Sequence, residues 1–141
     1  MYMLTFKIVT PDGVIYEDKV EKVTVPTTSG EITVLPKHVP LVSVLKAGEL
    51  VAYKDGNPVA MSVAGGVIEV QPDDKIYIMA DTAERAEHID LERAEAARQR
   101  AEEMMKQKEH ETDVDFARLQ ATIEREMARI RVAKKWRKLE K

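Results

Sequence analysis

Cysteine is absent from this chain of 141 residues, so neither a disulfide framework nor thiol chemistry is available to it. Long apolar runs are absent too, and no stretch approaches the roughly 18 residues that a membrane-spanning helix requires. The opening residues 1–4 lack the basic and apolar segments of a secretory signal. These absences fit a protein of a reducing compartment that meets a membrane only through a partner, without inserting into it.

Groups that perform catalysis are also scarce. His38 is the one histidine of the first 86 residues, and a lone loop histidine is more often a structural residue than a base or ligand. No cluster of cysteine and histidine predicts a metal site, and no G-x-x-x-x-G-K-[ST] segment predicts a Walker-type pocket. The pair Gly65-Gly66 precedes no helical pattern, which favours a tight turn or bulge over a phosphate loop. The sequence therefore predicts no catalytic site and no bound metal.

Charge is unevenly distributed, although the net charge is only −3. Residues 1–84 carry 7 basic and 12 acidic side chains, whereas residues 123–141 carry 8 basic and 3 acidic ones. An acidic body joined to a basic end predicts different partners for the two parts.

Residues 1–86 have the pattern of short β-strands separated by turns. Residues 4–10 alternate with period two, as a half-buried strand does, and Pro11-Asp12-Gly13 is a turn sequence. Further strand-like runs follow at spacings of about 8 to 12 residues, for a total of about eight or more, and no helical pattern lies between them. This pattern is typical of an antiparallel β-sandwich or barrel, which we expect to form the first domain.

Residues 87–141 have instead the pattern of two charged helices. Apolar residues of the first recur at steps of three or four, at Leu91, Ala94, Ala97, Ala101 and Met104 or Met105. After a polar pause near residue 111, the second helix is expected to bury one face made of Phe116, Leu119, Ile123, Met127 and Ile130. Ala117, Ala121, Ala128 and Val132 widen that face. Two helices joined by a short polar connection predict an antiparallel hairpin. Because its apolar seam is thin, it could open at a cost of a few kcal/mol, or else remain permanently docked.

Four segments carry a resemblance to a known family. They are residues 30–41 (GEITVLPKHVPL), 45–48 (LKAG), 65–70 (GGVIEV) and 89–94 (IDLERA). With the charged hairpin behind them, they make the chain similar, over its whole length, to the epsilon subunit of bacterial F-type ATP synthases.

The resemblance implies a flattened sandwich of about ten strands followed by a two-helix hairpin. It implies a non-catalytic place in the central rotor stalk, peripheral to the cytoplasmic face of the bacterial plasma membrane. There the sandwich binds the gamma subunit and the ring of c subunits. An extended hairpin reaches the alpha and beta subunits and blocks ATP hydrolysis. We expect the basic tail to act in this inhibition, through Arg131, Lys134, Lys135, Arg137 and Lys138.

The resemblance also implies a regulatory ligand, ATP, that the folded hairpin binds without hydrolysing it. The family motif I/L-D-x-x-R-A is intact from Ile89 to Ala94. By position, Glu84, Ile89 and Asp90 are expected at the adenine. The phosphates are expected to meet Arg93, Arg100, Arg125 and Arg129.

Helical spacing gives an independent test of this arginine set. Arg93 and Arg100 are seven residues apart, and Arg125 and Arg129 are four apart, so each pair shares a helix face. A turn near residue 111 places Arg93 level with Arg129. Four gathered guanidiniums repel one another unless an anion joins them, and a triphosphate supplies one. The alternative is that acidic neighbours neutralise them as ordinary surface pairs, namely Glu92, Glu124 and Glu126.

A second functional class is a stand-alone adaptor that uses the basic tail to bind nucleic acid or another protein. Trp136 is the single aromatic residue of that tail, which is a poor platform for stacking bases. The chain as a whole is acidic, so we expect no nucleic-acid partner.

Overall fold

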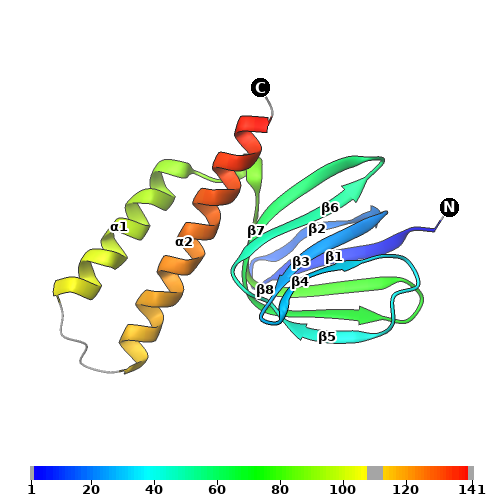
Figure 1. The fold of residues 1–141 in the computed structure, drawn as a ribbon, viewed down its shortest axis with the longest axis horizontal. Coiled ribbons are helices and arrows are strands. Elements are labelled where there is room, and N and C mark those ends of the chain that lie inside the picture. Colours follow the sequence, from blue (N-terminus) through cyan, green and yellow to red (C-terminus); the bar gives the residue numbers. More distant parts are fainter. Residues whose placement is uncertain (1, 108–112, 140–141) are drawn as a thin grey trace.

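The computed structural model describes residues 2–107 and 113–139, which form a β-sandwich followed by two helices (Figure 1). The strands are β1 (Leu4–Thr10), β2 (Gly13–Val20), β3 (Lys22–Thr27), β4 (Gly30–Val34), β5 (Leu41–Val44), β6 (Gly48–Lys54), β7 (Asn57–Gln71) and β8 (Lys75–Arg85). A 3-10 turn, η1 (Ala86–His88), leads into the helices α1 (Leu91–Gln107) and α2 (Asp113–Leu139). The turn expected near residue 111 lies outside the described residues. Neither described helix is long and apolar enough to cross a membrane.

One continuous sheet makes both layers of the sandwich, in the order β2-β1-β8-β7-β6-β3-β4, with β5 added beside β7. β1 and β8 run parallel, and the other strand pairs of the described chain are antiparallel. The expected antiparallel sandwich therefore contains one parallel pair. β7 connects the layers, because its first half pairs with β6 and its second half with β5.

The described residues contain eight strands, where the resemblance implies about ten, and β7 accounts for part of the difference. The sequence pattern predicts two separate strands, one before and one after Gly65-Gly66, but the structure has one strand of 15 residues. Both halves of β7 keep a single register with β8, so pairing continues past the glycines. These glycines have φ values of +69° and +102°, which bend the strand without ending it.

Gly66 is the position where a side chain is least tolerable. A Cβ there would overlap the carbonyl oxygen of Met79 and lie 2.8 Å from the Cα of Ala80. Gly66→Ala should therefore lower the free energy of unfolding by about 3 kcal/mol, because backbone strain and a backbone clash combine. Gly56→Ala is the matched control, since Gly56 also has positive φ but faces open space. Urea unfolding of both variants measures the difference, and equal midpoints would contradict the clash.

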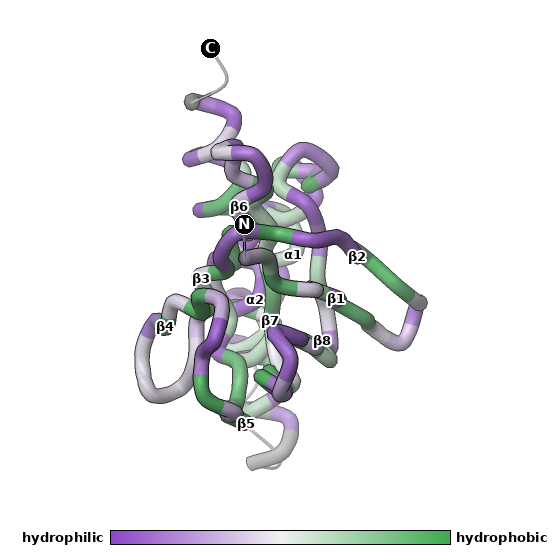
Figure 2. Tube along the Cα trace, turned by 90° about the vertical axis from the view of Figure 1, so that its right-hand side faces the viewer, coloured by the Kyte–Doolittle hydropathy of each residue, from purple (hydrophilic) through white to green (hydrophobic). Residues whose placement is uncertain are grey.

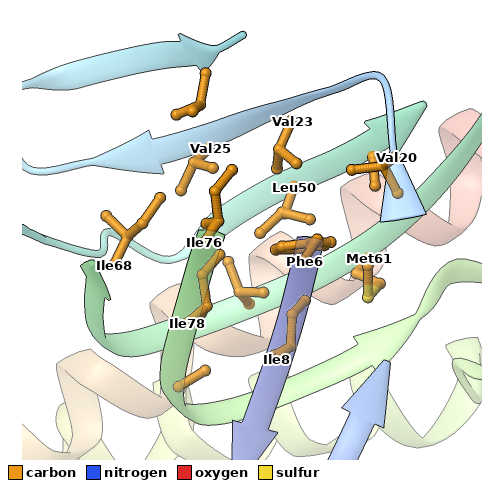
Figure 3. Close-up of a cluster of buried hydrophobic side chains, with 14 of the residues drawn as sticks. Phe6, Ile8, Val20, Val23, Val25, Leu50, Met61, Ile68, Ile76 and Ile78 are labelled. Carbon is orange, nitrogen blue, oxygen red and sulfur yellow. The ribbon is translucent and has the colours of Figure 1, made fainter. Parts of the chain in front are cut away.

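The core lies between the two layers (Figure 3). Every strand except β5 supplies fully buried residues to it, and Leu41 of β5 packs against it half-buried. Phe6 and Ile8 of β1, Leu50 of β6 and Ile76 and Ile78 of β8 are fully buried there. These are the inward positions of alternating strands, as the period-two pattern predicts.

α2 lies between α1 and the sandwich and packs against both (Figure 1). A second apolar cluster forms under its C-terminal half. The cluster joins Val51 and Ala60 of the sandwich, Ala86 and Ile89 of the connection, and Val132 and Ala133 of α2. The hairpin is thus docked on the outer face of β6 and β7.

The face expected to be buried on the second helix is confirmed at Ala128 and Val132 and wrong at the large residues Phe116 and Met127. Met127 is 42% exposed and Phe116 is 36% exposed, while Ala128, Val132 and Ala133 are fully buried. The reason is that α2 has two packing partners on different sides. Small residues allow close approach to both, so no single large apolar stripe marks the buried surface.

Candidate functional site

A cavity of about 480 Å³ opens at the joint between the sandwich and the hairpin. Four elements meet there: the end of β8, the connection after it, the first half of α1 and the middle of α2. The lining residues are Glu84, His88, Asp90, Arg93, Ala96, Ala97, Arg100 and Arg129.

Asp90 fixes the start of α1 and hence the position of Arg93. Its Oδ1 accepts a hydrogen bond from the Arg93 backbone N–H at 3.1 Å, and its carbonyl accepts one from Ala94 at 3.0 Å. This is an N-cap, which satisfies a free donor and places a carboxylate at the positive end of the helix dipole. Arg93 therefore stands in the first turn of α1, with Arg100 two turns further on the same wall of the cavity.

Arg129 forms the opposite wall and ties α2 to the sandwich. Its Nε donates to Oε2 of Glu84 at 3.1 Å, and its Nη2 lies 3.0 Å from the same oxygen in an ion pair. Its Nη1 donates to Oε2 of Glu126 at 2.8 Å. The Arg129 side chain is 21% exposed. Both carboxylates are thus charged partners of one guanidinium at the boundary of the cavity.

Five of the expected nucleotide residues meet around this cavity: Glu84, Asp90, Arg93, Arg100 and Arg129. The other three do not line it. Ile89 is 1% exposed and belongs to the second apolar cluster, and Ala94 is fully buried in the hairpin. Both support the joint from beneath its surface.

Arg125 departs from the expected arginine patch. It lines two neighbouring cavities of about 310 and 340 Å³, together with Asp81 and Thr82 of β8. Its Nε donates to Oε1 of Glu126 at 3.3 Å. Arg125 lies one helical turn from Arg129, and Glu126 holds it on the sheet side of α2. Three arginines rather than four therefore line the 480 Å³ cavity, while Arg125 lines the adjoining 310 Å³ cavity, which shares Glu84 and Arg129 with it.

Sequence reasoning missed three lining residues and misjudged the setting of another. Ala96 and Ala97 leave room between Arg93 and Arg100, which small residues on that helix face could have indicated, and His88 adds a titratable ring. The sequence predicts Glu126 only as a surface counter-ion, but in the structure it is 3% exposed.

The electrostatics of the cavity favour an anion. Its lining carries three arginines against the carboxylates of Glu84 and Asp90. Among the ion pairs of the described residues, none uses the side chain of Arg93 or Arg100. Guanidinium groups that have no carboxylate partner are suited to bind phosphate through paired N–H donors.

Residues of the basic tail occupy the C-terminal turns of α2, which are largely hydrophilic (Figure 2). Lys135 Nζ and Trp136 Nε1 donate to the two oxygens of Glu49 on β6 at 3.0 and 2.9 Å. Arg137 donates to the carbonyl of Ile89. Lys134 lies 3.5 Å from Glu95 of α1.

Arg131 and Lys138 differ from these tail residues. Both are exposed, and neither takes part in an ion pair within the described part of the chain.

Comparisons with known proteins agree with this architecture. The chain matches the sequence models of two ATP synthase Delta/Epsilon chain domains, the beta-sandwich domain over residues 3–86 and the long alpha-helix domain over residues 87–134. It is 42% identical to the ATP synthase epsilon chain of Bacillus licheniformis over 134 residues, covering 95% of this chain and all of that one. It is 46% identical to the epsilon chain of Bacillus subtilis over 114 residues, covering 81% and 86% of the two chains.

Solved structures share the fold at lower identity. A chain of the Euglena gracilis mitochondrial ATP synthase superposes with a TM-score of 0.75 and 21% identity, covering 91% of this chain and 79% of that one. A chain of the Tetrahymena thermophila mitochondrial ATP synthase, from a structure of its central stalk and c-ring, superposes with a TM-score of 0.67 and 13% identity. The match covers 92% of this chain and 96% of that one.

A β-sandwich with a docked helical hairpin thus defines an accessory, rather than catalytic, subunit of an ATP synthase. More particularly, the chain belongs to the epsilon-chain family of F-type ATP synthases.

Proposed function

We propose that this chain is a regulatory subunit of the central stalk of a bacterial ATP synthase, and that ATP bound at the joint keeps its hairpin docked. The observation that carries the proposal is the cavity between hairpin and sandwich, where Arg93 and Arg100 of α1 face Arg129 of α2. These residues are adjacent only while the hairpin is folded. A ligand that bridges them therefore favours the docked state.

The proposed assembly is the one that the resemblance to the family implies. The sandwich joins the gamma subunit to the c-subunit ring on the cytoplasmic face of the plasma membrane, as a peripheral subunit. An extended hairpin inserts between the alpha and beta subunits and inhibits ATP hydrolysis. In support, a structural neighbour comes from a structure of the central stalk and c-ring. The competing adaptor function needs a free basic tail, whereas Lys135, Trp136 and Arg137 contact the chain's own sandwich and joint.

ATP serves in this proposal as a signal and is not hydrolysed. A carboxylate beside the adenine, from Glu84 or Asp90, accepts hydrogen bonds from the base, and the arginines bind the phosphates. Undocking removes α2 and with it Arg129, so the extended state loses the site. A ligand shifts an equilibrium by its differential affinity for the two states. ATP at ten times its dissociation constant stabilises the docked state by roughly 1.4 kcal/mol.

The direct test is the thermal unfolding of the isolated chain with and without ATP. At ten times the dissociation constant of ATP, the midpoint should rise by about 4 °C, because the ligand binds only the docked form. Adenosine at the same concentration is the control and should give a much smaller rise, since it brings no phosphate to the arginines. An unchanged midpoint at millimolar ATP would contradict the proposed ligand.

For the gamma subunit, we propose the outer face of the layer that contains β5, β1 and β2. Cross-strand partners place Val44, Val67, Met79, Val9 and Val14 in one row over five strands. Val14, Val44 and Met79 are 56%, 52% and 47% exposed. The hairpin covers the opposite layer, so this apolar row stays open to a partner, and apolar patches of this kind mark protein interfaces.

Replacing Val44 and Met79 together by Asp should weaken gamma binding by about a hundredfold, because two charges would enter an apolar contact. Both side chains point outward, so the sandwich should keep its stability. Asn57→Asp, at an exposed turn beside the other layer, is the control. Surface plasmon resonance with immobilised gamma measures the affinities. Full binding by the double variant would exclude this face.

A further inference from the structure

Glu126 is a buried carboxylate within the hairpin. It is 3% exposed, and each of its oxygens contacts an arginine of α2. Its Oε1 accepts from Arg125 Nε at 3.3 Å, and its Oε2 accepts from Arg129 Nη1 at 2.8 Å. Burying an ionised carboxylate is costly unless cations and hydrogen bonds compensate it, so these contacts hold the two guanidiniums firmly.

The two helices differ in their charge balance. On α2, Arg125 and Arg129 meet the carboxylates of Glu126 and Glu84, so two positive charges face two negative ones. On α1, the side chains of Arg93 and Arg100 form no ion pair within the described residues. The positive charge that can attract an anion therefore comes mainly from α1.

We infer that Glu126 is a resident counter-anion, which occupies Arg125 and Arg129 in place of nucleotide phosphate. This inference rests on the proposed binding of ATP at the joint. A resident counter-anion stabilises the docked hairpin but weakens nucleotide binding. The hairpin docks without nucleotide, because its arginines are already neutralised. Nucleotide affinity is reduced, because a phosphate must share Arg129 with a carboxylate and approach a buried negative charge.

Glu126 and Glu84 have separate roles in this arrangement. Glu84 belongs to β8, so its contact with Arg129 breaks when α2 leaves the sandwich. Glu126 lies on α2 itself, beside Arg125 and three residues before Arg129, so its ion pairs with them remain when α2 undocks. Removing the charge of Glu126 therefore leaves Arg125 and Arg129 less neutralised. The ion pair between Arg129 and Glu84, which joins the hairpin to the sheet, remains.

The test compares Glu126→Gln with Glu124→Gln in the full-length chain. Glu124 is an exposed residue of the same helix and takes part in no ion pair of the described residues, which makes it a matched control. Calorimetric titration should show that E126Q binds ATP about tenfold more tightly than the wild type. E124Q should bind like the wild type. Glu126→Asp keeps the charge and should also remain close to the wild type.

A second measurement reports docking itself. Trp136 is the only tryptophan and donates to Glu49 of the sandwich, so its fluorescence follows the contact between hairpin and sheet. Without ATP, the hairpin of E126Q should undock at a lower urea concentration than that of the wild type. Addition of ATP should raise this urea midpoint more in E126Q than in the wild type. A merely structural residue would change the first midpoint and leave ATP affinity unchanged.

The outcomes are distinguishable. Equal ATP affinities of E126Q and the wild type would overturn the role of Glu126 and leave the nucleotide site standing. No binding by the wild type or by E126Q would overturn the proposed nucleotide site, and this inference with it. Circular dichroism of the sheet verifies that each variant is folded.

Discussion

Arg93→Ala should reduce the affinity for ATP by a hundredfold or more. Arg93 lies in the first turn of α1, its backbone N–H is held by Asp90, and its side chain faces the cavity. It is not neutralised by a carboxylate in the described part of the chain, so a phosphate gains its full charge-assisted hydrogen bonds. Losing two such bonds, at about 1.5 kcal/mol each, accounts for the factor.

The chain offers a close control for this variant. Arg98 lies on the same helix but forms a pair with Glu102 at 3.0 Å and does not line the cavity. Arg98→Ala removes the same charge and should leave ATP affinity nearly unchanged. Arg93→Lys should recover only part of the affinity, because an ammonium lacks the planar fork of donors. If Arg93→Ala binds ATP as tightly as the wild type, the joint is a structural cap and the ligand binds elsewhere.

The site residues that could be predicted are those fixed by local rules. Asp90 and Arg93 are three residues apart, which is the spacing of an N-cap and its donor. Arg93 and Arg100 share a helix face because of the helical repeat alone. Level pairing across an antiparallel hairpin then brings Arg129 to Arg93, and the structure places both on one cavity.

The residues that could not be predicted depend on a third partner. A hairpin considered alone gives Arg125 the same face as Arg129, but in the protein α2 also contacts the sandwich. Arg125 therefore lies beside Asp81 and Thr82 of β8, where its Nε donates to the buried Glu126. Ile89 is buried under the C-terminal half of α2 for the same reason. No pattern within α2 distinguishes the side that meets the sheet from the side that meets α1.

The strand pattern shows the same limit. Alternation predicts which residues of β1 and β8 enter the core, since this depends on the pleat. It does not predict that β7 continues through Gly65-Gly66, because glycines with positive φ are equally typical of a turn. Continuity depends on β8, whose register with β7 extends over both halves.

Inhibition of ATP hydrolysis should respond in opposite directions to two kinds of change in the tail. Arg131 and Lys138 are exposed in the docked state and form no ion pair within the described chain. Replacing both by Ala should leave docking unchanged but remove two charges that, in the proposed inhibited state, the extended hairpin presents to the alpha and beta subunits. Hydrolysis by the reconstituted complex should rise by about tenfold, because charge-assisted contacts in the inhibited state are lost.

Glu49→Gln changes the docked state instead. Glu49 accepts from Lys135 at 3.0 Å and from Trp136 at 2.9 Å, so its charge fastens the end of α2 to β6. The amide weakens this contact and leaves every tail residue intact. The hairpin should extend more often, and hydrolysis should fall several-fold at low ATP. Saturating ATP should restore part of the activity by redocking the hairpin.

The pair of results distinguishes a tail that inhibits from a tail that only stabilises the fold. If the tail merely supported the subunit, both changes would alter hydrolysis in the same direction or not at all. Lys106→Ala with Arg118→Ala removes two charges at the far end of the hairpin and serves as the control for charge alone. Rates are measured on complexes with equal epsilon content, over a range of ATP concentrations. A fall in hydrolysis with Arg131→Ala and Lys138→Ala would exclude these residues from the inhibitory contact, because their removal can only weaken it.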